Sequence, residues 1–124
     1  MTKILHLLKL RLPWLFSAAL GLTTALMLWP FPPSNDGWIY TDKVEHVLVF
    51  IVLTSLGILS YTRWPSLICI GLMAYGAIIE LLQATLTTTR QASWADWLAD
   101  SVGIALGFIV YYYILSKKCR PNLI

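Results

Sequence analysis

Charge is scarce in this chain of 124 residues. Only 12% of the residues are charged, 58% are hydrophobic, and the mean hydropathy is +0.71, whereas about 25% of the residues in a typical soluble domain are charged. The two cysteines, Cys69 and Cys119, lack the number and the spacing of a disulfide framework or a zinc site. These deficits exclude an ordinary water-soluble domain and predict a protein whose solvent is largely lipid.

The basic residues do not form a stripe that would bind nucleic acid, although the net charge is +3 and the isoelectric point is near 9.0. They gather outside the long apolar runs, as the topology signals of membrane proteins do. We therefore expect a lipid bilayer as the surroundings and no nucleic-acid partner.

Four apolar runs are long enough to cross a bilayer, whose hydrocarbon core of about 30 Å requires about 20 helical residues. They span residues 12–31, 44–61, 65–86 and 93–115. The connections "TRWPS" and "TTTRQA" are short, so the helices that they join must be antiparallel. The sequence predicts an all-α membrane protein with a single domain, residues 1–124, built as a compact antiparallel bundle of four transmembrane helices.

The orientation is predicted from the positive-inside rule. With the amino terminus inside, the outer segments contain only Lys43 and Arg90 as basic residues. The inner segments contain Lys3, Lys9, Arg11, Arg63, Lys117, Lys118 and Arg120. Both termini are therefore predicted to be cytoplasmic. The first run ends in "WPFPPSNDG", which lacks the small residues of a signal-peptidase site, so we expect it to remain uncleaved.

The acidic residues are confined to the outer half of this predicted bundle. The six are Asp36, Asp42, Glu45, Glu80, Asp96 and Asp100. From the helical rise, His46 lies about 6 Å below the outer surface, and Glu80 and Asp100 lie about 9 to 10 Å below it. Spacings of three or four residues put the polar positions of each run on one helix face. The sequence therefore predicts one polar layer shared by three helices.

A simpler explanation stays open for the acids near helix starts. "DKVE" and "SWAD" resemble capping boxes, in which side chains only satisfy the free N–H groups of a first turn and favour the helix dipole. The residues that this explanation covers are Asp42, Glu45, Ser93 and Asp96.

Capping does not explain Glu80 or Asp100, which lie well inside apolar runs. A charged carboxylate at such depth must be paired, hydrated or protonated. The simpler explanation for these two is a buried pair with Arg90, Lys43 or His46 that locks the bundle.

Small residues mark the expected helix contacts. The fourth run contains a G-x-x-x-G pattern made by Gly103 and Gly107. The third run contains three small residues, Gly71, Ala74 and Gly76. Such residues let membrane helices approach closely, and we expect these contacts within one chain rather than between two.

Three sequence blocks resemble the signature blocks of VanZ-like membrane proteins. They are "DKVEHVLVF" at 42–50, "ELLQ" at 80–83 and "RQASWADWLADSVGIALG" at 90–107. The resemblance implies a small bacterial plasma-membrane protein of a family named for low-level resistance to the glycopeptide teicoplanin, and it implies no particular reaction. One position departs from the pattern, because the family commonly has asparagine where this chain has the titratable Asp100.

The first functional hypothesis is an outward-facing site that binds or modifies an envelope lipid, either a lipid-linked cell-wall precursor or a phospholipid, with a link to teicoplanin resistance. Lys43 and Arg90 would contact phosphate or carboxylate, while the acids would bond hydroxyls or amides. The predicted ligand-binding residues are Asp42, Lys43, Glu80, Gln83, Arg90, Asp96 and Asp100.

The second hypothesis is a membrane-embedded hydrolase or transferase. His46 would act as general acid or base on a phosphoryl or acyl group, oriented by Asp42 or Glu80. The sequence has no G-x-S-x-G or H-E-x-x-H motif that would define such chemistry. No cofactor is expected and no metal, because a site made of His46, Glu80 and Asp100 would contain a single histidine.

Overall fold

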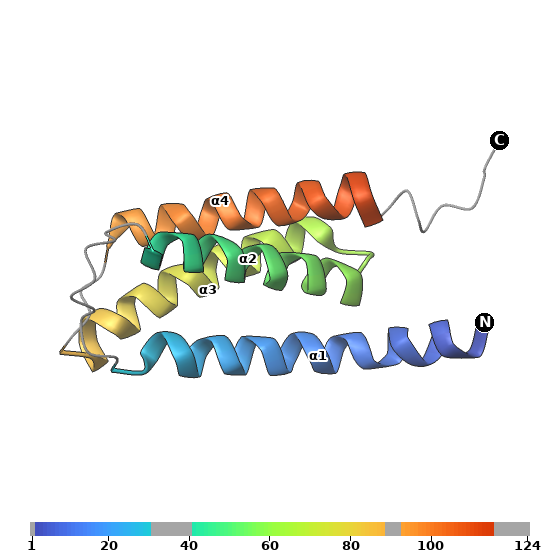
Figure 1. Cartoon of the computed structure of the whole chain (residues 1–124), viewed down its shortest axis with the longest axis horizontal. Helices are drawn as coiled ribbons and strands as arrows, with labels where there is room; N and C mark the ends of the chain where they lie inside the picture. Colours follow the sequence, from blue (N-terminus) through green and yellow to red (C-terminus); the bar gives the residue numbers. More distant parts are fainter. Residues whose placement is uncertain (1, 31–40, 89–92, 116–124) are drawn as a thin grey trace.

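The computed structural model describes residues 2–30, 41–88 and 93–115. They form four helices, α1 (Thr2–Leu28), α2 (Thr41–Ser60), α3 (Pro65–Leu86) and α4 (Trp94–Val110), and α4 continues into a π-helical turn, Tyr111–Leu115. Successive helices run in opposite directions, so α1 begins and α4 ends at the same end of the bundle (Figure 1). The prediction of an all-helical protein with four helices is confirmed.

The first helix differs from its predicted range of 12–31. It begins at Thr2 and ends at Leu28, and Pro13 lies inside it. The prediction followed the apolar run, but the helix formers Leu and Lys that precede the run extend the helix. It stops before Pro30, which cannot continue a helix and restricts the residue before it. The predicted third helix has the observed bounds of α3, which starts with a proline in its first turn.

Three helices are long and apolar enough to cross a membrane. The segments among the described residues are His6–Leu28, Thr41–Ser60 and Pro65–Leu86. The fourth helix has 17 residues before its π-helical turn, and two of them are aspartates. A fourth span therefore stays a prediction.

The core lies where α2 meets the other helices. Phe50, Leu53 and Ile79 are almost completely buried, and Phe16 of α1 joins the same apolar cluster. Among the element pairs, α2 and α4 share the most extensive contact. The face of α1 that points away from the bundle carries exposed large apolar side chains. A helix that is apolar on its outer face is suited to lipid.

The glycines of α4 permit the close contact with α2. A Cβ added at Gly103 would lie 2.6 Å from Val47 O, and one added at Gly107 would lie 2.7 Å from Thr54 Cβ. The prediction of an intramolecular G-x-x-x-G contact is confirmed. On α3 the prediction holds for Gly76, which faces Asp100, but it is wrong for Gly71, which has no neighbour within 4 Å.

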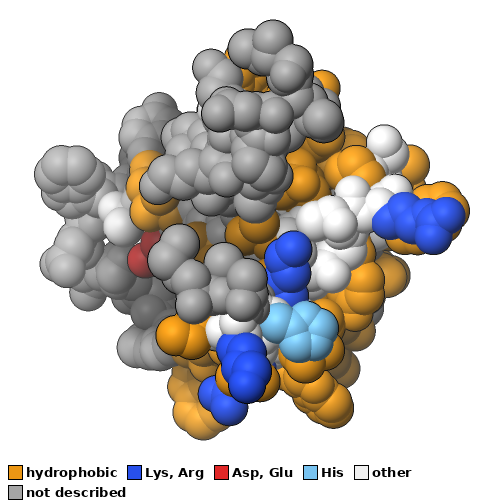
Figure 2. Space-filling view, turned by 90° about the vertical axis from the view of Figure 1, so that its right-hand side faces the viewer, with side chains coloured by type: hydrophobic (Ala, Val, Ile, Leu, Met, Phe, Trp, Pro, Cys, Tyr) orange, Lys and Arg blue, Asp and Glu red, His pale blue; other side chains and the backbone are white. Residues whose placement is uncertain are grey.

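Charge is divided between the two ends of the bundle. Of the five described Lys and Arg residues, Lys43 lies at the start of α2 and the other four lie at the end where α1 begins: Lys3, Lys9, Arg11 and Arg63. Blue side chains are visible on this end in Figure 2. We call it the basic end. The described acids all lie toward the opposite, acidic end, at the start of α2 and α4 and near the end of α3: Asp42, Glu45, Glu80, Asp96 and Asp100.

Candidate functional site

Three helices bring polar side chains together at the acidic end. The start of α2 contributes Asp42, Lys43 and His46, the late turns of α3 contribute Glu80, and the first turns of α4 contribute Asp96 and Asp100. We call these six residues the polar cluster. His46 is only 2% exposed, Glu80 6% and Asp100 1%, so the cluster extends into the bundle.

The centre of the polar cluster is a buried hydrogen bond between two helices. His46 Nδ1 lies 2.7 Å from Asp100 Oδ1. With Asp100 as a carboxylate, the imidazole Nδ1–H donates to Oδ1, and in a neutral ring Nε2 is then the accepting nitrogen. Asp42 and Glu80 were the expected orienting partners of His46, but the residue that holds Nδ1 is Asp100. The bond also confirms one alternative left open by the sequence, a buried pair of Asp100 with His46.

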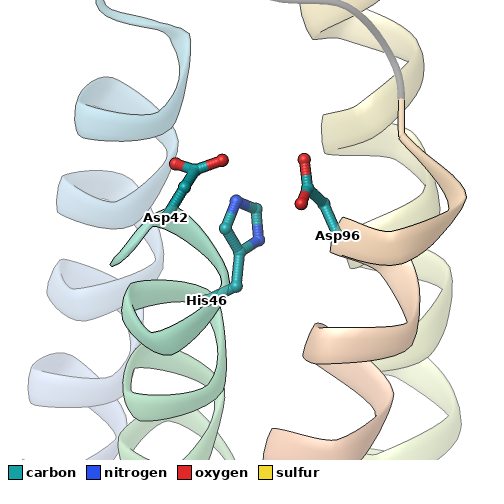
Figure 3. A group of neighbouring side chains, drawn as sticks. All are labelled: Asp42, His46 and Asp96. Atoms are coloured by element: carbon teal, nitrogen blue, oxygen red, sulfur yellow. The ribbon is translucent and has the colours of Figure 1, made fainter. Parts of the chain in front are cut away.

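Two further carboxylates flank the imidazole. Figure 3 shows the His46 ring between Asp42, one turn earlier on α2, and Asp96 of α4. Lys43 Nζ lies 3.3 Å from Asp96 Oδ1, and the lysine is partly exposed. The polar cluster therefore becomes more solvated from Asp100 toward Lys43, and an ion pair closes its outer side.

Glu80 connects α3 to the start of α4. Ser93 N–H donates to Glu80 Oε2 at 3.0 Å. The capping-box alternative assigned this role to the Ser93 side chain, which makes no capping hydrogen bond. The acceptor comes instead from another helix, because Ser93, the residue before α4, lies against the late turns of α3. Glu80 therefore does satisfy an N–H group at a helix start, contrary to the sequence-based argument.

Two carboxylate oxygens are buried without a hydrogen-bond partner in the described part of the chain, Glu80 Oε1 and Asp100 Oδ2. Asp100 Oδ2 faces α3 at Gly76, 2.8 Å from where a Cβ would stand. Glu80 lies one turn further along the same helix, on the same face. A buried polar atom without a partner costs about 1 to 3 kcal/mol, and more when it is charged. The two oxygens are therefore available to accept a hydrogen bond from a ligand or to bind a cation.

A family model described as VanZ/LLP1 matches residues 4–116, a range that includes nearly all of the four helices. The chain belongs to the VanZ/LLP1 family. Family membership and three helices apolar enough to span a bilayer make it a multi-pass membrane protein. No curated protein and no solved structure matches the chain.

Gln83, one of the predicted ligand-binding residues, supports the VanZ/LLP1 fold. Its buried amide Nε2 donates to Met27 O at 2.8 Å, near the end of α1. This bond satisfies a carbonyl group that the end of a helix would otherwise leave without a partner. Gln83 thus holds α1 against α3 beside the polar cluster.

Two predicted residues cannot be placed. Arg90, the predicted phosphate ligand, and Asp36 lie outside the described residues.

One polar residue that was not singled out from the sequence, Thr54, lies below the cluster on α2. Thr54 is fully buried and its hydroxyl has no hydrogen-bond partner among the described residues. It follows His46 by eight positions, and Phe50 lies between them on the same helix face. The spacing of four and eight residues from His46 places Thr54 on the same helix face. The apolar residues around Thr54 drew attention away from this spacing in the sequence.

Two triplets of side chains have the proximity of metal ligands. In Asp42, His46 and Asp96, and again in His46, Glu80 and Asp100, one ligand atom from each residue lies within 4.8 Å of the others. The second triplet is completely buried. An imidazole with two carboxylates suits a divalent transition metal.

Proposed function

We propose that this VanZ/LLP1 protein binds the polar headgroup of an envelope lipid at its acidic end, which faces the outside of a bacterial plasma membrane. The basic end would face the cytoplasm, with α4 as a fourth span and both termini inside. The charge division between the ends supports this orientation, since cytoplasmic segments are rich in Lys and Arg.

The observation that carries the proposal is the pair of buried oxygens without partners, Glu80 Oε1 and Asp100 Oδ2. Carboxylates accept hydrogen bonds, so a headgroup with hydroxyl, amide or amine donors would satisfy them. Lys43, partly exposed at the outer side, would meet a phosphate, and Arg90 would add a bidentate contact. A phosphate next to donor groups is the chemistry of both phospholipids and lipid-linked cell-wall precursors.

Lipid copurification tests this proposal directly. We expect a specific envelope lipid, identified by mass spectrometry, to copurify with wild-type protein and to be lost from the Arg90→Ala and Lys43→Ala variants. Arg63→Ala is the matched control, because Arg63 is an exposed cation at the basic end. If all four proteins carry the same lipids in equal amounts, the headgroup site does not exist.

Teicoplanin resistance would be a consequence of the lipid interaction. Sequestering or modifying a lipid-linked precursor would alter the supply of the glycopeptide target. Cells that produce the wild-type protein should then tolerate more teicoplanin than cells that produce Arg90→Ala at the same protein level. Equal tolerance of the two kinds of cell would show that the proposed site does not contribute to teicoplanin resistance.

A second candidate function rests on the His46–Asp100 bond. A carboxylate that holds Nδ1 leaves Nε2 free to take a proton, the arrangement that general bases use. In this case the protein is a hydrolase or transferase acting on a phosphoryl or acyl group. Purified protein should then turn over labelled lipid-linked phosphates, and His46→Ala should abolish the product while His6→Ala retains it. A product that survives His46→Ala would exclude this role.

A further inference from the structure

We infer that His46, Glu80 and Asp100 form a site for one divalent transition-metal ion, Zn²⁺ or Mn²⁺. Each residue comes from a different helix, α2, α3 and α4 respectively. The ion would occupy the two oxygens that the proposed headgroup would otherwise satisfy, Glu80 Oε1 and Asp100 Oδ2. The two proposals are therefore alternatives at these atoms, and separate measurements test them.

The spacing of the three side chains fits one ion. A ligand atom from each lies within 4.8 Å of the other two. Nitrogen and oxygen ligands bind Zn²⁺ at about 2.0 to 2.2 Å, so two ligands on one ion are separated by no more than roughly 4.4 Å. Small side-chain movements therefore close the site without moving a helix.

Two buried oxygens at this site lack a hydrogen-bond partner among the described residues. Glu80 Oε1 and Asp100 Oδ2 belong to side chains that are more than nine-tenths buried, and neither has a hydrogen-bond partner in the described residues. The other oxygen of each residue is already bonded, to Ser93 N–H and to His46 Nδ1. In the metal-free protein those bonds orient both carboxylates and leave one oxygen of each without a partner.

The charge of the site favours a divalent cation. When both are ionised, Glu80 and Asp100 bring two negative charges into a buried region, and the nearby described cation, Lys43, is already paired with Asp96. A divalent ion with two carboxylates and a neutral imidazole makes the group neutral, which removes most of the cost of burial.

This triplet is a better site than Asp42, His46 and Asp96. In the latter, the Lys43 ammonium occupies one carboxylate at 3.3 Å and would repel a cation. Within the buried triplet, the ion would replace the hydrogen bond between His46 Nδ1 and Asp100 Oδ1. The imidazole proton then resides on Nε2, since a coordinating imidazole is neutral.

The ligand set indicates which metal would bind. Imidazole favours Zn²⁺ over Mg²⁺ or Ca²⁺, whereas two carboxylates also suit Mn²⁺. We predicted no metal from the sequence, because a site with a single histidine ligand is weak evidence without the distances between helices.

Metal titration of the purified full-length protein tests the inference. The protein in detergent is stripped with a chelator, and Zn²⁺ or Mn²⁺ alone is then titrated, with Mg²⁺ for comparison. We expect about one Zn²⁺ or Mn²⁺ per chain, and affinity lower by on the order of tenfold or more in Glu80→Gln and Asp100→Asn. The control variants His6→Gln and Glu45→Gln change exposed residues and should bind as the wild type does.

X-ray absorption spectroscopy of the Zn²⁺-loaded wild type makes the test independent of how the variants fold. One imidazole nitrogen with oxygen ligands is expected. A sulfur ligand, two imidazoles, no stoichiometric binding by monodisperse wild type, or equal binding by folded Glu80→Gln would each overturn the inference.

Discussion

Asp100 is the residue in which two structural roles meet. One oxygen accepts a hydrogen bond from His46 at 2.7 Å, while the other is buried against Gly76. Asparagine retains an oxygen that can accept the first bond and carries no charge. The two roles can therefore be separated by substitution.

The first prediction compares Asp100→Asn with Asp100→Ala in metal-free protein. We expect Asn to keep the free energy of unfolding within about 1 kcal/mol of wild type, and Ala to lower it by about 1 to 3 kcal/mol because His46 Nδ1–H is left buried and unpaired. Unfolding in detergent micelles measures both, with Glu45→Gln as an exposed acidic control. Equal losses in the two variants would mean that the His46 bond contributes nothing.

Gln83 provides a second prediction at this scale. Replacing Gln83 by Leu removes the hydrogen bond to Met27 O and should destabilise the protein by about 1 kcal/mol or somewhat more, since the carbonyl loses its partner. Thr85→Ala is the control, because Thr85 is exposed and bonds only within its own helix. Unchanged stability of Gln83→Leu would show that the link between α1 and α3 is dispensable.

The contact of α2 with α4 determines the geometry of the polar cluster at the scale of whole helices. Val47 and Phe50 of α2 approach Gly103 so closely that no side chain fits between the backbones. Gly103 follows Asp100 by three residues on α4, and Val47 directly follows His46 on α2. The close approach therefore constrains the distance that the hydrogen bond between His46 and Asp100 spans. The packing of α2 against α4 and the hydrogen bond between His46 and Asp100 therefore depend on the same helix pair.

The third prediction concerns this helix pair. Gly103→Ala should destabilise the protein by about 1 to 3 kcal/mol, because its Cβ would meet the backbone oxygen of Val47, which cannot rotate away. Gly21→Ala is the matched control, since nothing lies within 4 Å of its Cβ position and the change should be neutral or slightly stabilising. Comparable destabilisation by both variants would refute the close contact.

The sequence predicted the helices better than their contacts. Pro65 and the apolar run after it define α3 locally, and the spacing from Asp96 to Asp100 places both on one face of α4. Partners across helices depend on crossing geometry that no local pattern encodes. For this reason the Glu80 bond to Ser93 N–H was not foreseen, and the His46–Asp100 pair was only one of several alternatives.

For the molecule as a whole, the division of charge between the ends leads to the fourth prediction. In a background with Cys69→Ser and Cys119→Ser, a membrane-impermeant maleimide should label Glu45→Cys in intact cells. Thr62→Cys, in the turn at the basic end, should be labelled only after permeabilisation, because that end would face the cytoplasm. Both replaced residues are exposed, so accessibility differs only through topology.

The opposite labelling pattern would place the polar cluster in the cytoplasmic leaflet and contradict the proposed headgroup site, while leaving the metal site intact. Labelling of both positions from outside would contradict a single crossing of the membrane by α2, the helix between them.

The two aspartates of α4 have a consequence for biogenesis. An aspartate at the centre of an isolated membrane helix raises the free energy of insertion by about 2.5 to 3.5 kcal/mol, and by less near the helix end. Here the compensating partners, Lys43 and His46, belong to α2. If α4 crosses the membrane, its insertion is therefore coupled to helices that emerge from the ribosome earlier. In that case α4 inserts into the bilayer together with the earlier helices, and without α2 it would remain at the membrane surface.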